Sequence, residues 1–127
     1  MTEPKVYSYS KCSTCRKALR WLDEHGVSYG TTDIVTTPPS KKELKLALER
    51  SGLPVSKLFN TSGQSYREGK WGERLKRTSE SEALEALSKD GKLVKRPLVL
   101  GDDFALVGFS EPDYVARFVK KKGIVPR

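Results

Sequence analysis

Two cysteines three positions apart, Cys12 and Cys15, are the residues of this sequence best suited to chemistry. A thiolate can attack a disulfide, and a second thiol close by can then displace the product. An alternating apolar stretch at residues 5–9 precedes the pair and favours a strand, whereas the residues after it have helical periodicity. We therefore expect Cys12 at a helix N-terminus, where free N–H groups and the helix dipole lower the pKa of a thiol. Cys15, one turn further on, is then its neighbour.

The residues around the first cysteine are basic or carry hydroxyl groups. Lys11, Arg16 and Lys17 add positive charge that further favours a thiolate. Ser13 and Thr14 lie between the two cysteines. We predict that Ser13, Thr14 and Lys11 contact the substrate.

Two other interpretations of the cysteine pair remain open, namely a pair of inert buried cysteines and half of a zinc site. A zinc ion needs four ligands as a rule, and outside the pair only His25 is available. We therefore predict no bound metal, and we assign His25 to a helix end or the surface.

Arg96 and Pro97 form a second group of candidate residues. A proline at the start of an apolar strand is unusual, because it removes a hydrogen-bond donor from the sheet. If this segment lies against the cysteine turn, a cis peptide before Pro97 would expose backbone groups to a bound thiol chain. Arg96 would then lie beside the sulfur of Cys12 and hold the thiolate or an oxyanion. The alternative is an edge proline next to a solvated arginine.

The elements that must position these residues follow a strand–helix–strand order. A strand at residues 5–9 is followed by a helix from 13 to about 25, which Gly26 ends, and by a strand at 27–34. Two later helices begin at capping-box sequences, Ser40–Glu43 and Ser79–Glu82.

The remaining segments complete a mixed sheet. Residues 54–59 favour a short helical turn, and residues 60–72 a loop with a fragment of helix. Tyr66 and Trp71 in that loop either cover the active site or belong to a second apolar cluster. The apolar stretches end with 97–100 and 104–107, which Gly101-Asp102-Asp103 joins as a hairpin turn, and a final helix begins at Ser110. With Cys-x-x-Cys after the first strand, this pattern predicts an α/β fold of thioredoxin-like type, a mixed sheet with flanking helices.

Composition narrows the class of protein. The 127 residues fit a single domain, and no apolar run approaches the ~20 residues of a membrane span. The first five residues lack the apolar core of a signal peptide. Two cysteines in one motif are too few for a secreted disulfide scaffold. We therefore expect a cytoplasmic protein. The net charge of +8 suits an acidic partner or simply a solvated surface, since most basic residues are mixed with glutamate.

Five stretches together resemble the ArsC arsenate reductase family over about residues 5–119. They are Cys12–Ala18, Pro38–Ser40, Asn60–Gly63 before Tyr66, Lys95–Leu98 and Gly108–Glu111. The resemblance implies a bacterial cytosolic protein with a thioredoxin-like core, about residues 5–35 and 92–119, and a helical insertion, about 38–90, within one domain over 1–127. It implies that Cys12 is the nucleophile and Arg96 its basic partner, and that Pro97 is cis.

The sequence departs from the glutathione-linked arsenate reductases of this family. Those enzymes use three arginines around the nucleophile, whereas here only Arg96 matches, with Asn60 and Gly108 at the other two positions. They also lack a cysteine at the position of Cys15. Fewer guanidinium groups should weaken arsenate binding. Two subgroups of the family are more similar, the glutaredoxin-like ArsC-like proteins and Spx, a regulator that binds RNA polymerase and whose cysteine pair is a redox switch.

We therefore expect a monomeric thiol–disulfide oxidoreductase with Cys12 as nucleophile and Cys15 or glutathione as the resolving thiol. Arg96 stabilises the nucleophile, and Asn60 and Pro97 join the substrate contacts. No cofactor is tightly bound, and the partner is glutathione as co-substrate or a protein thiol. The alternative is a redox-sensing transcriptional regulator of Spx type that binds RNA polymerase. A lesser alternative is arsenate reduction. Direct DNA reading is not expected, because no recognition-helix pattern occurs.

Overall fold

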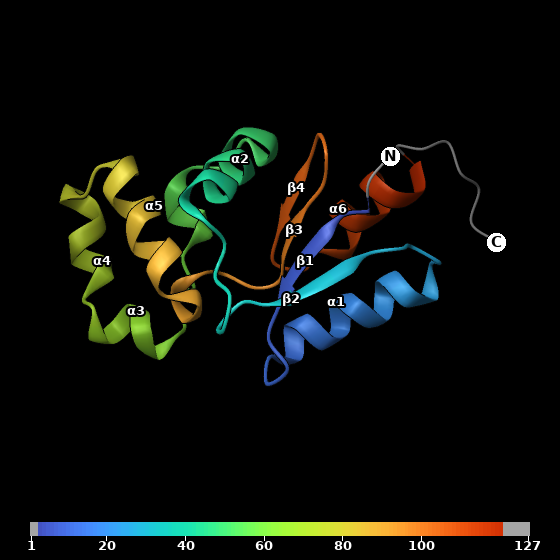
Figure 1. Ribbon diagram of the computed structural model, residues 1–127, viewed down its shortest axis with the longest axis horizontal. Helices are drawn as coiled ribbons and strands as arrows, with labels where there is room; N and C mark the ends of the chain where they lie inside the picture. Colours follow the sequence, from blue (N-terminus) through green and yellow to red (C-terminus); the bar gives the residue numbers. More distant parts are fainter. Residues whose placement is uncertain (1–2, 121–127) are drawn as a thin grey trace.

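The computed structural model describes residues 3–120 and contains a four-stranded mixed sheet with helices on both faces (Figure 1). The strands are β1 (Lys5–Ser8), β2 (Gly30–Asp33), β3 (Leu98–Leu100) and β4 (Ala105–Val107), in the order β2-β1-β3-β4. Strand β1 pairs in parallel with β2 and antiparallel with β3, and β3 and β4 form an antiparallel hairpin. The predicted fold class, a mixed sheet with flanking helices, is confirmed.

The helices are α1 (Ser13–Glu24), α2 (Lys41–Ser51), α3 (Gln64–Glu68), α4 (Trp71–Arg74), α5 (Glu80–Lys89) and α6 (Glu111–Val115). Short helical turns are η1 (Val55–Leu58), η2 (Leu75–Arg77), η3 (Gly91–Leu93) and η4 (Ala116–Lys120), the last continuing α6. Figure 1 shows α2 to α5 on one side of the sheet and α1 and α6 on the other. All of the helices from α2 to α5 lie between β2 and β3 in the chain.

Each face of the sheet packs on its own apolar cluster. Neighbouring strand residues point to opposite faces, so Val6 and Val99 join one cluster and Tyr7 and Leu98 the other. The cluster under α1 and α6 consists of Val6, Ala18, Trp21, Leu22, Val99, Tyr114 and Phe118. The larger cluster collects side chains of α2, α4, α5 and η1. Burial of these residues fixes the sheet between its two helical layers.

Local sequence signals mark the helix ends where they were expected. Cys12 is the N-cap of α1, and Gly26 follows that helix with φ of +68°. The capping boxes Ser40–Glu43 and Ser79–Glu82 are both formed, at the starts of α2 and α5. Strand β2, in contrast, begins only at Gly30, because the preceding Val27 and Tyr29 pack against the α1 cluster instead of pairing with a strand.

The middle of the chain is more helical than predicted. Residues 60–72, predicted as a loop with one fragment of helix, contain α3 and the start of α4, which η2 follows. Trp71 is buried, and its ring centre lies 5.2 Å from that of Phe59, which also contacts the ring of Tyr66. Tyr66 and Trp71 therefore belong to an apolar cluster, the second of the two interpretations given above.

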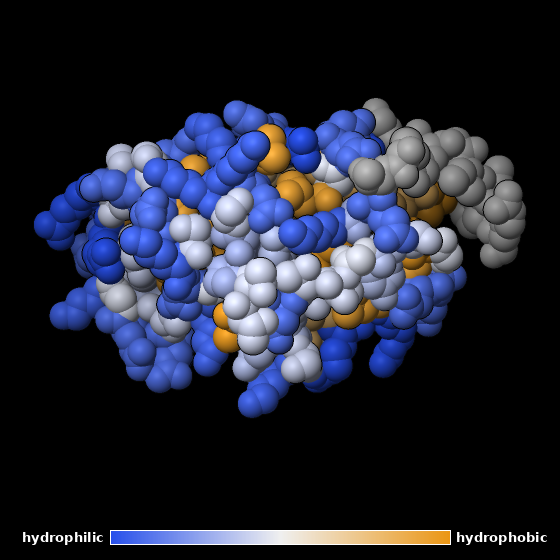
Figure 2. All heavy atoms as spheres, in the orientation of Figure 1, coloured by the Kyte–Doolittle hydropathy of each residue, from blue (hydrophilic) through white to orange (hydrophobic). Residues whose placement is uncertain are grey.

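The surface in view is mainly hydrophilic, with small separated apolar patches (Figure 2). Leu53 is the large apolar side chain that is exposed within residues 3–120. No helix in this part of the chain has the length and apolar character needed to cross a bilayer.

Candidate active site

The turn between β1 and α1 holds the sulfur of Cys12 at the start of the helix. The backbone N–H of Cys12 donates to the carbonyl oxygen of Tyr9 at 3.0 Å, which closes the turn. Cys12 has the extended backbone of an N-cap residue, with φ of −99° and ψ of 114°. Its Sγ accepts a hydrogen bond of 3.3 Å from the backbone N–H of Cys15. The sulfur thus takes the place of the oxygen that usually caps a helix, and the predicted position of Cys12 is confirmed.

The two thiols differ strongly in acidity. Burial acts to raise the pKa of Cys12, but hydrogen bonds from the side chain and backbone of Cys15 and the guanidinium of Arg96 together outweigh it. The pKa of Cys12 is therefore lowered from its ordinary value of 9.0. Burial, and next the hydrogen bond with Cys12, raise the pKa of Cys15 to about 12. Cys12 is half-buried and Cys15 buried, and neither is in a disulfide. The outer, more acidic sulfur is the one able to attack a substrate.

Arg96 is the cation that acts on Cys12. Its Nη1 donates to the carbonyl oxygen of Lys92 at 3.2 Å, and its Cζ lies 5.4 Å from the ring centre of Tyr9. The peptide bond between Arg96 and Pro97 is cis, as predicted. The buried Nε of Arg96 has no hydrogen-bond partner among the described residues, so the guanidinium retains an unused donor.

The other three basic residues of the motif lie on the surface. Lys11, Arg16 and Lys17 are exposed, and Arg16 donates to the carbonyl oxygen of Ser10. None of the three is among the causes of the lowered pKa of Cys12. All three side chains lie in solvent, where charge is screened, so Arg96 is the basic residue to which the lowered pKa of Cys12 is assigned.

A cleft of about 490 Å³ opens beside Cys12. Its lining comes from four separate stretches of the chain, namely Cys12 and Thr14, Asn60 and Ser62, Lys95 and Arg96, and Val107 to Ser110. Backbone hydrogen bonds hold these stretches together. Lys95 N–H donates to the oxygen of Leu58 at 2.7 Å, and Asn60 N–H to that of Leu93 at 2.8 Å. The N–H of Gly108 donates to the oxygen of Pro97 at 2.8 Å.

The predicted site residues divide into two groups. Those that line the cleft are Cys12, Thr14, Asn60 and Arg96. The other four do not line it. Ser13 and Lys11 are exposed to solvent elsewhere, and the side chains of Cys15 and Pro97 are buried. A substrate in the cleft therefore meets Thr14 and Asn60 directly.

Several lining residues were not predicted as site residues. They are Ser62, Lys95, Val107, Gly108, Phe109 and Ser110. A signal for them was present, because most belong to the stretches that carry the resemblance to the ArsC family. Four of those five stretches converge on the cleft. Within residues 3–120, no group of three or more His, Cys, Asp or Glu side chains could hold a metal ion. His25 stacks on Trp21 at the far end of α1.

Comparison with known protein sequences finds relatives that match most of this chain. The protein YusI of Bacillus subtilis is 50% identical over 108 residues, which cover 85% of this chain and 92% of that protein. The global transcriptional regulator Spx of Listeria innocua is 26% identical over 117 residues, 92% of this chain and 87% of the regulator.

Solved structures have the same fold. An ArsC-family related protein from Bacteroides fragilis superposes with a TM-score of 0.88 at 43% identity, covering 91% of this chain and 97% of that one. A possible arsenate reductase from Streptococcus mutans gives a TM-score of 0.81 at 38% identity, covering 90% and 98%. The model of the ArsC family matches residues 7–117, which include every residue of the cleft. The chain belongs to the ArsC family.

Proposed function

We propose that this protein is a thiol–disulfide oxidoreductase in which Cys12 is the nucleophile. The observation that carries the proposal is the pair of unlike thiols at the start of α1, one acidic and facing a cleft, the other buried with a raised pKa. Thiol–disulfide exchange needs such a pair, because the attacking sulfur must be ionised and a second sulfur must release the product.

The first step forms a mixed disulfide. The Cys12 thiolate attacks one sulfur of a substrate R–S–S–R, so the bond between Cys12 and that sulfur forms, the substrate's S–S bond breaks, and R–S⁻ leaves. Arg96 stabilises the thiolate before the attack. Asn60 and Thr14, which line the cleft, donate hydrogen bonds to the bound chain, and backbone beside Pro97 aligns it.

The second step releases the product. Cys15 gives up its proton and attacks the sulfur of Cys12, so a Cys12–Cys15 disulfide forms and the second R–S⁻ leaves, with two electrons passed from the protein to the substrate. The hydrogen bond and the charge of Cys12 are among the causes that raise the pKa of Cys15. Both causes disappear once Cys12 is in a mixed disulfide, so Cys15 becomes more acidic when it is needed. Glutathione, as an external thiol, can perform the same displacement.

A single-turnover experiment tests this function. The reduced protein is mixed with bis(2-hydroxyethyl) disulfide, and released thiol and protein mass are followed together. The wild type should release two thiols and end as an internal disulfide. Cys15→Ser should release one thiol and retain the mixed disulfide on Cys12, whereas Cys12→Ser should release none. Equal thiol release by Cys12→Ser and the wild type would overturn the proposal.

A redox-sensing regulator is the second candidate, and its support is the likeness to Spx over most of both chains. In that function the Cys12–Cys15 disulfide changes a surface that contacts RNA polymerase. Capture experiments with the reduced and the oxidised protein test it. Recovery of polymerase subunits in one redox state supports the regulator, and recovery in neither state excludes it.

Arsenate reduction is the third candidate, because some relatives in the family carry that name. The described part of the cleft holds one arginine, Arg96, and one lysine, Lys95. Adding arsenate with glutathione to the single-turnover assay separates this function from the first, since an arsenate reductase would convert arsenate to arsenite.

A further inference from the structure

The side chain of Lys95 lies in the cleft next to Gly108, and the absence of a side chain at Gly108 leaves room for it. A Cβ atom added at Gly108 would lie 3.0 Å from Cε of Lys95 and 3.8 Å from its Nζ. The side chain of Lys95 therefore occupies the space that a side chain at position 108 would take. Gly108 has φ of +78°, a conformation that favours glycine. The backbone at both ends is fixed, since Lys95 N–H binds Leu58 and Gly108 N–H binds Pro97.

The charge of the cleft is one-sided. Of its ten lining residues two are cations, Lys95 and Arg96, and none is a carboxylate. Within residues 3–120 the ammonium of Lys95 makes neither a side-chain hydrogen bond nor an ion pair, and the buried Nε of Arg96 is also without a partner. The hydroxyl groups of Thr14, Ser62 and Ser110 and the amide of Asn60 add further donors.

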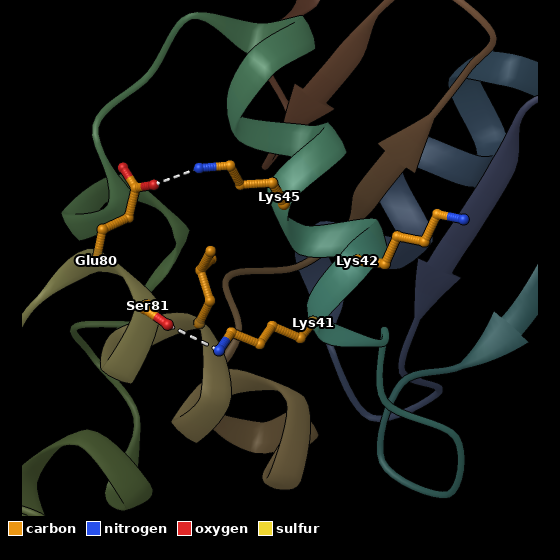
Figure 3. A pocket seen from close by; sticks show the side chains of 6 residues that line it. Lys41, Lys42, Lys45, Glu80 and Ser81 are labelled. Carbon is orange, nitrogen blue, oxygen red and sulfur yellow. Dashed lines mark hydrogen bonds and ion pairs between the residues drawn. The ribbon is translucent and has the colours of Figure 1, made fainter.

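A second cavity in the molecule shows the opposite arrangement. It lies between α2 and α5 and is lined by three lysines (Figure 3). There Lys45 donates to Glu80 at 2.9 Å, and Lys41 donates to Ser81 at 2.8 Å and lies 3.7 Å from Glu85. Two of those three lysines, Lys41 and Lys45, are thus paired within the protein, whereas Lys95 in the cleft beside Cys12 has no such partner.

We propose that Lys95 is a specificity-determining residue that selects small disulfides carrying an anionic group, such as a carboxylate, near the sulfur. The inference rests on the proposed function and names its substrate class. The anion pairs with the ammonium of Lys95 while the sulfur approaches Cys12, and both side chains line the same cleft. A volume of about 490 Å³ suits a small molecule.

Three disulfides of similar size test the proposal in single-turnover reactions with the reduced protein. Dithiodipropionate carries two carboxylates, bis(2-hydroxyethyl) disulfide is neutral, and cystamine carries two ammonium groups. Each rate constant is divided by that of Lys95→Met with the same compound, so that intrinsic differences between the leaving thiols cancel. Lys92→Met is the matched control, because Lys92 is an exposed lysine three residues away that does not line the cleft.

Relative to the neutral disulfide, we expect Lys95→Met to slow the anionic disulfide about three- to fivefold and to speed the cationic one. Lys95→Arg should keep the preference, Lys92→Met should behave as the wild type, and high salt should remove the difference. An equal change for all three disulfides, or no change for any, would overturn the role of Lys95 while leaving the proposed function intact.

A second measurement does not depend on disulfide reduction. In a Cys15→Ser background, Cys12 is alkylated with anionic iodoacetate and neutral iodoacetamide, each of which loses iodide as the sulfur–carbon bond forms. Lys95→Met should lower the iodoacetate-to-iodoacetamide rate ratio by about three- to fivefold. If the protein reduces no disulfide but the ratio falls, the proposed function fails and the anion selection remains. An unchanged ratio contradicts the role of Lys95.

Discussion

The backbone N–H of Cys15 donates a hydrogen bond of 3.3 Å to the Sγ of Cys12. One contact thus serves two purposes, because it caps α1 and stabilises a negative charge on the sulfur. The pKa of Cys12 is therefore lowered by hydrogen bonds from the side chain and the backbone of Cys15, to which Arg96 adds a further hydrogen bond and a charge. The same turn leaves Cys15 buried behind Cys12, where its thiol can attack the Sγ of Cys12 once Cys12 is in a mixed disulfide.

Removal of the Arg96 charge should make Cys12 less acidic. In Arg96→Gln we expect the pKa of Cys12 to rise, because both the hydrogen bond and the positive charge that lower it are lost. The rate of alkylation near pH 7 should fall about three- to tenfold, in proportion to the thiolate fraction. Lys17→Gln is the control, since Lys17 is exposed on α1 and outside the cleft. An equal rise of the pKa of Cys12 in both variants would show that Arg96 does not lower this pKa more than an exposed lysine does.

Glu43 should link the stability of the fold to pH. Its carboxylate accepts from Tyr7 at 2.6 Å, from Lys5 at 3.1 Å and from the N–H of Ser40 at 3.1 Å, joining β1 to α2. Burial acts to raise the pKa of Glu43, but the hydrogen bonds from Tyr7 and Ser40 and the ion pair with Lys5 lower it below its ordinary 4.5. A lowered pKa in the folded state means stability that is present above about pH 5 and is lost as pH falls through the folded value.

Replacement of this carboxylate tests the link directly. We expect Glu43→Gln to lower the free energy of unfolding by about 1–2 kcal/mol at pH 7. The difference from the wild type should shrink as pH falls below the ordinary carboxyl range. Urea unfolding at a series of pH values measures both quantities, and Glu49→Gln is a control on the same helix. A difference that stays constant down to pH 3 would contradict the argument.

Gly91 should not accept a side chain. A Cβ at this position would lie 1.8 Å from the carbonyl oxygen of Ile34, and that oxygen is backbone that cannot turn aside. We expect Gly91→Ala to lower the free energy of unfolding by about 1–3 kcal/mol through overpacking. Gly30→Ala is the control, because nothing lies within 4 Å of a Cβ there. Denaturant melts of the two variants measure the effect, and equal stability would refute the close approach.

Trp71 should stabilise the fold without affecting the chemistry. Its indole is 5% exposed and packs in the larger apolar cluster with Phe59. We expect Trp71→Ala to lower the free energy of unfolding by about 3–5 kcal/mol. Trp71→Phe should cost less and leave the pKa of Cys12 unchanged, since Trp71 does not line the cleft. A changed pKa in the folded Trp71→Phe variant would instead favour the interpretation of Trp71 as a cover of the active site.

The parts of the fold that the sequence predicts are those with strong local signals. Cys12 at the N-cap of α1, the two capping boxes and the hairpin turn after β3 all depend on residues close in the chain. The helices α3 and α4 lack side-chain caps, and Lys70, the N-cap residue of α4, has φ of +54°. Packing on Phe59 stabilises these two helices, and no pattern within residues 60–72 predicts that packing.

The candidate site likewise combines residues that the sequence indicates with residues that only tertiary packing brings to the cleft. The cleft lining includes Cys12 and Thr14, which the cysteine motif indicates, Arg96, which the Arg96-Pro97 pair indicates, and Asn60, which only the resemblance to the family indicates. The position of Lys95 depends on the residue at position 108, thirteen residues later in the chain, being glycine. The bridge between Phe59 and Val94 brings Asn60 beside this segment. Such placements arise from tertiary packing of segments distant in the sequence.

The most direct test is the rate of alkylation of Cys12 by iodoacetamide against pH, measured in Cys15→Ser so that one thiol reacts. The backbone N–H at position 15 and the guanidinium of Arg96 remain in this variant, and the serine hydroxyl can donate the side-chain hydrogen bond that the Cys15 thiol gives in the wild type. The rate should follow a single ionisation with a midpoint below the ordinary thiol pKa of 9.0. A midpoint at or above that value would contradict the assignment of Cys12 as an activated nucleophile, and with it the proposed oxidoreductase.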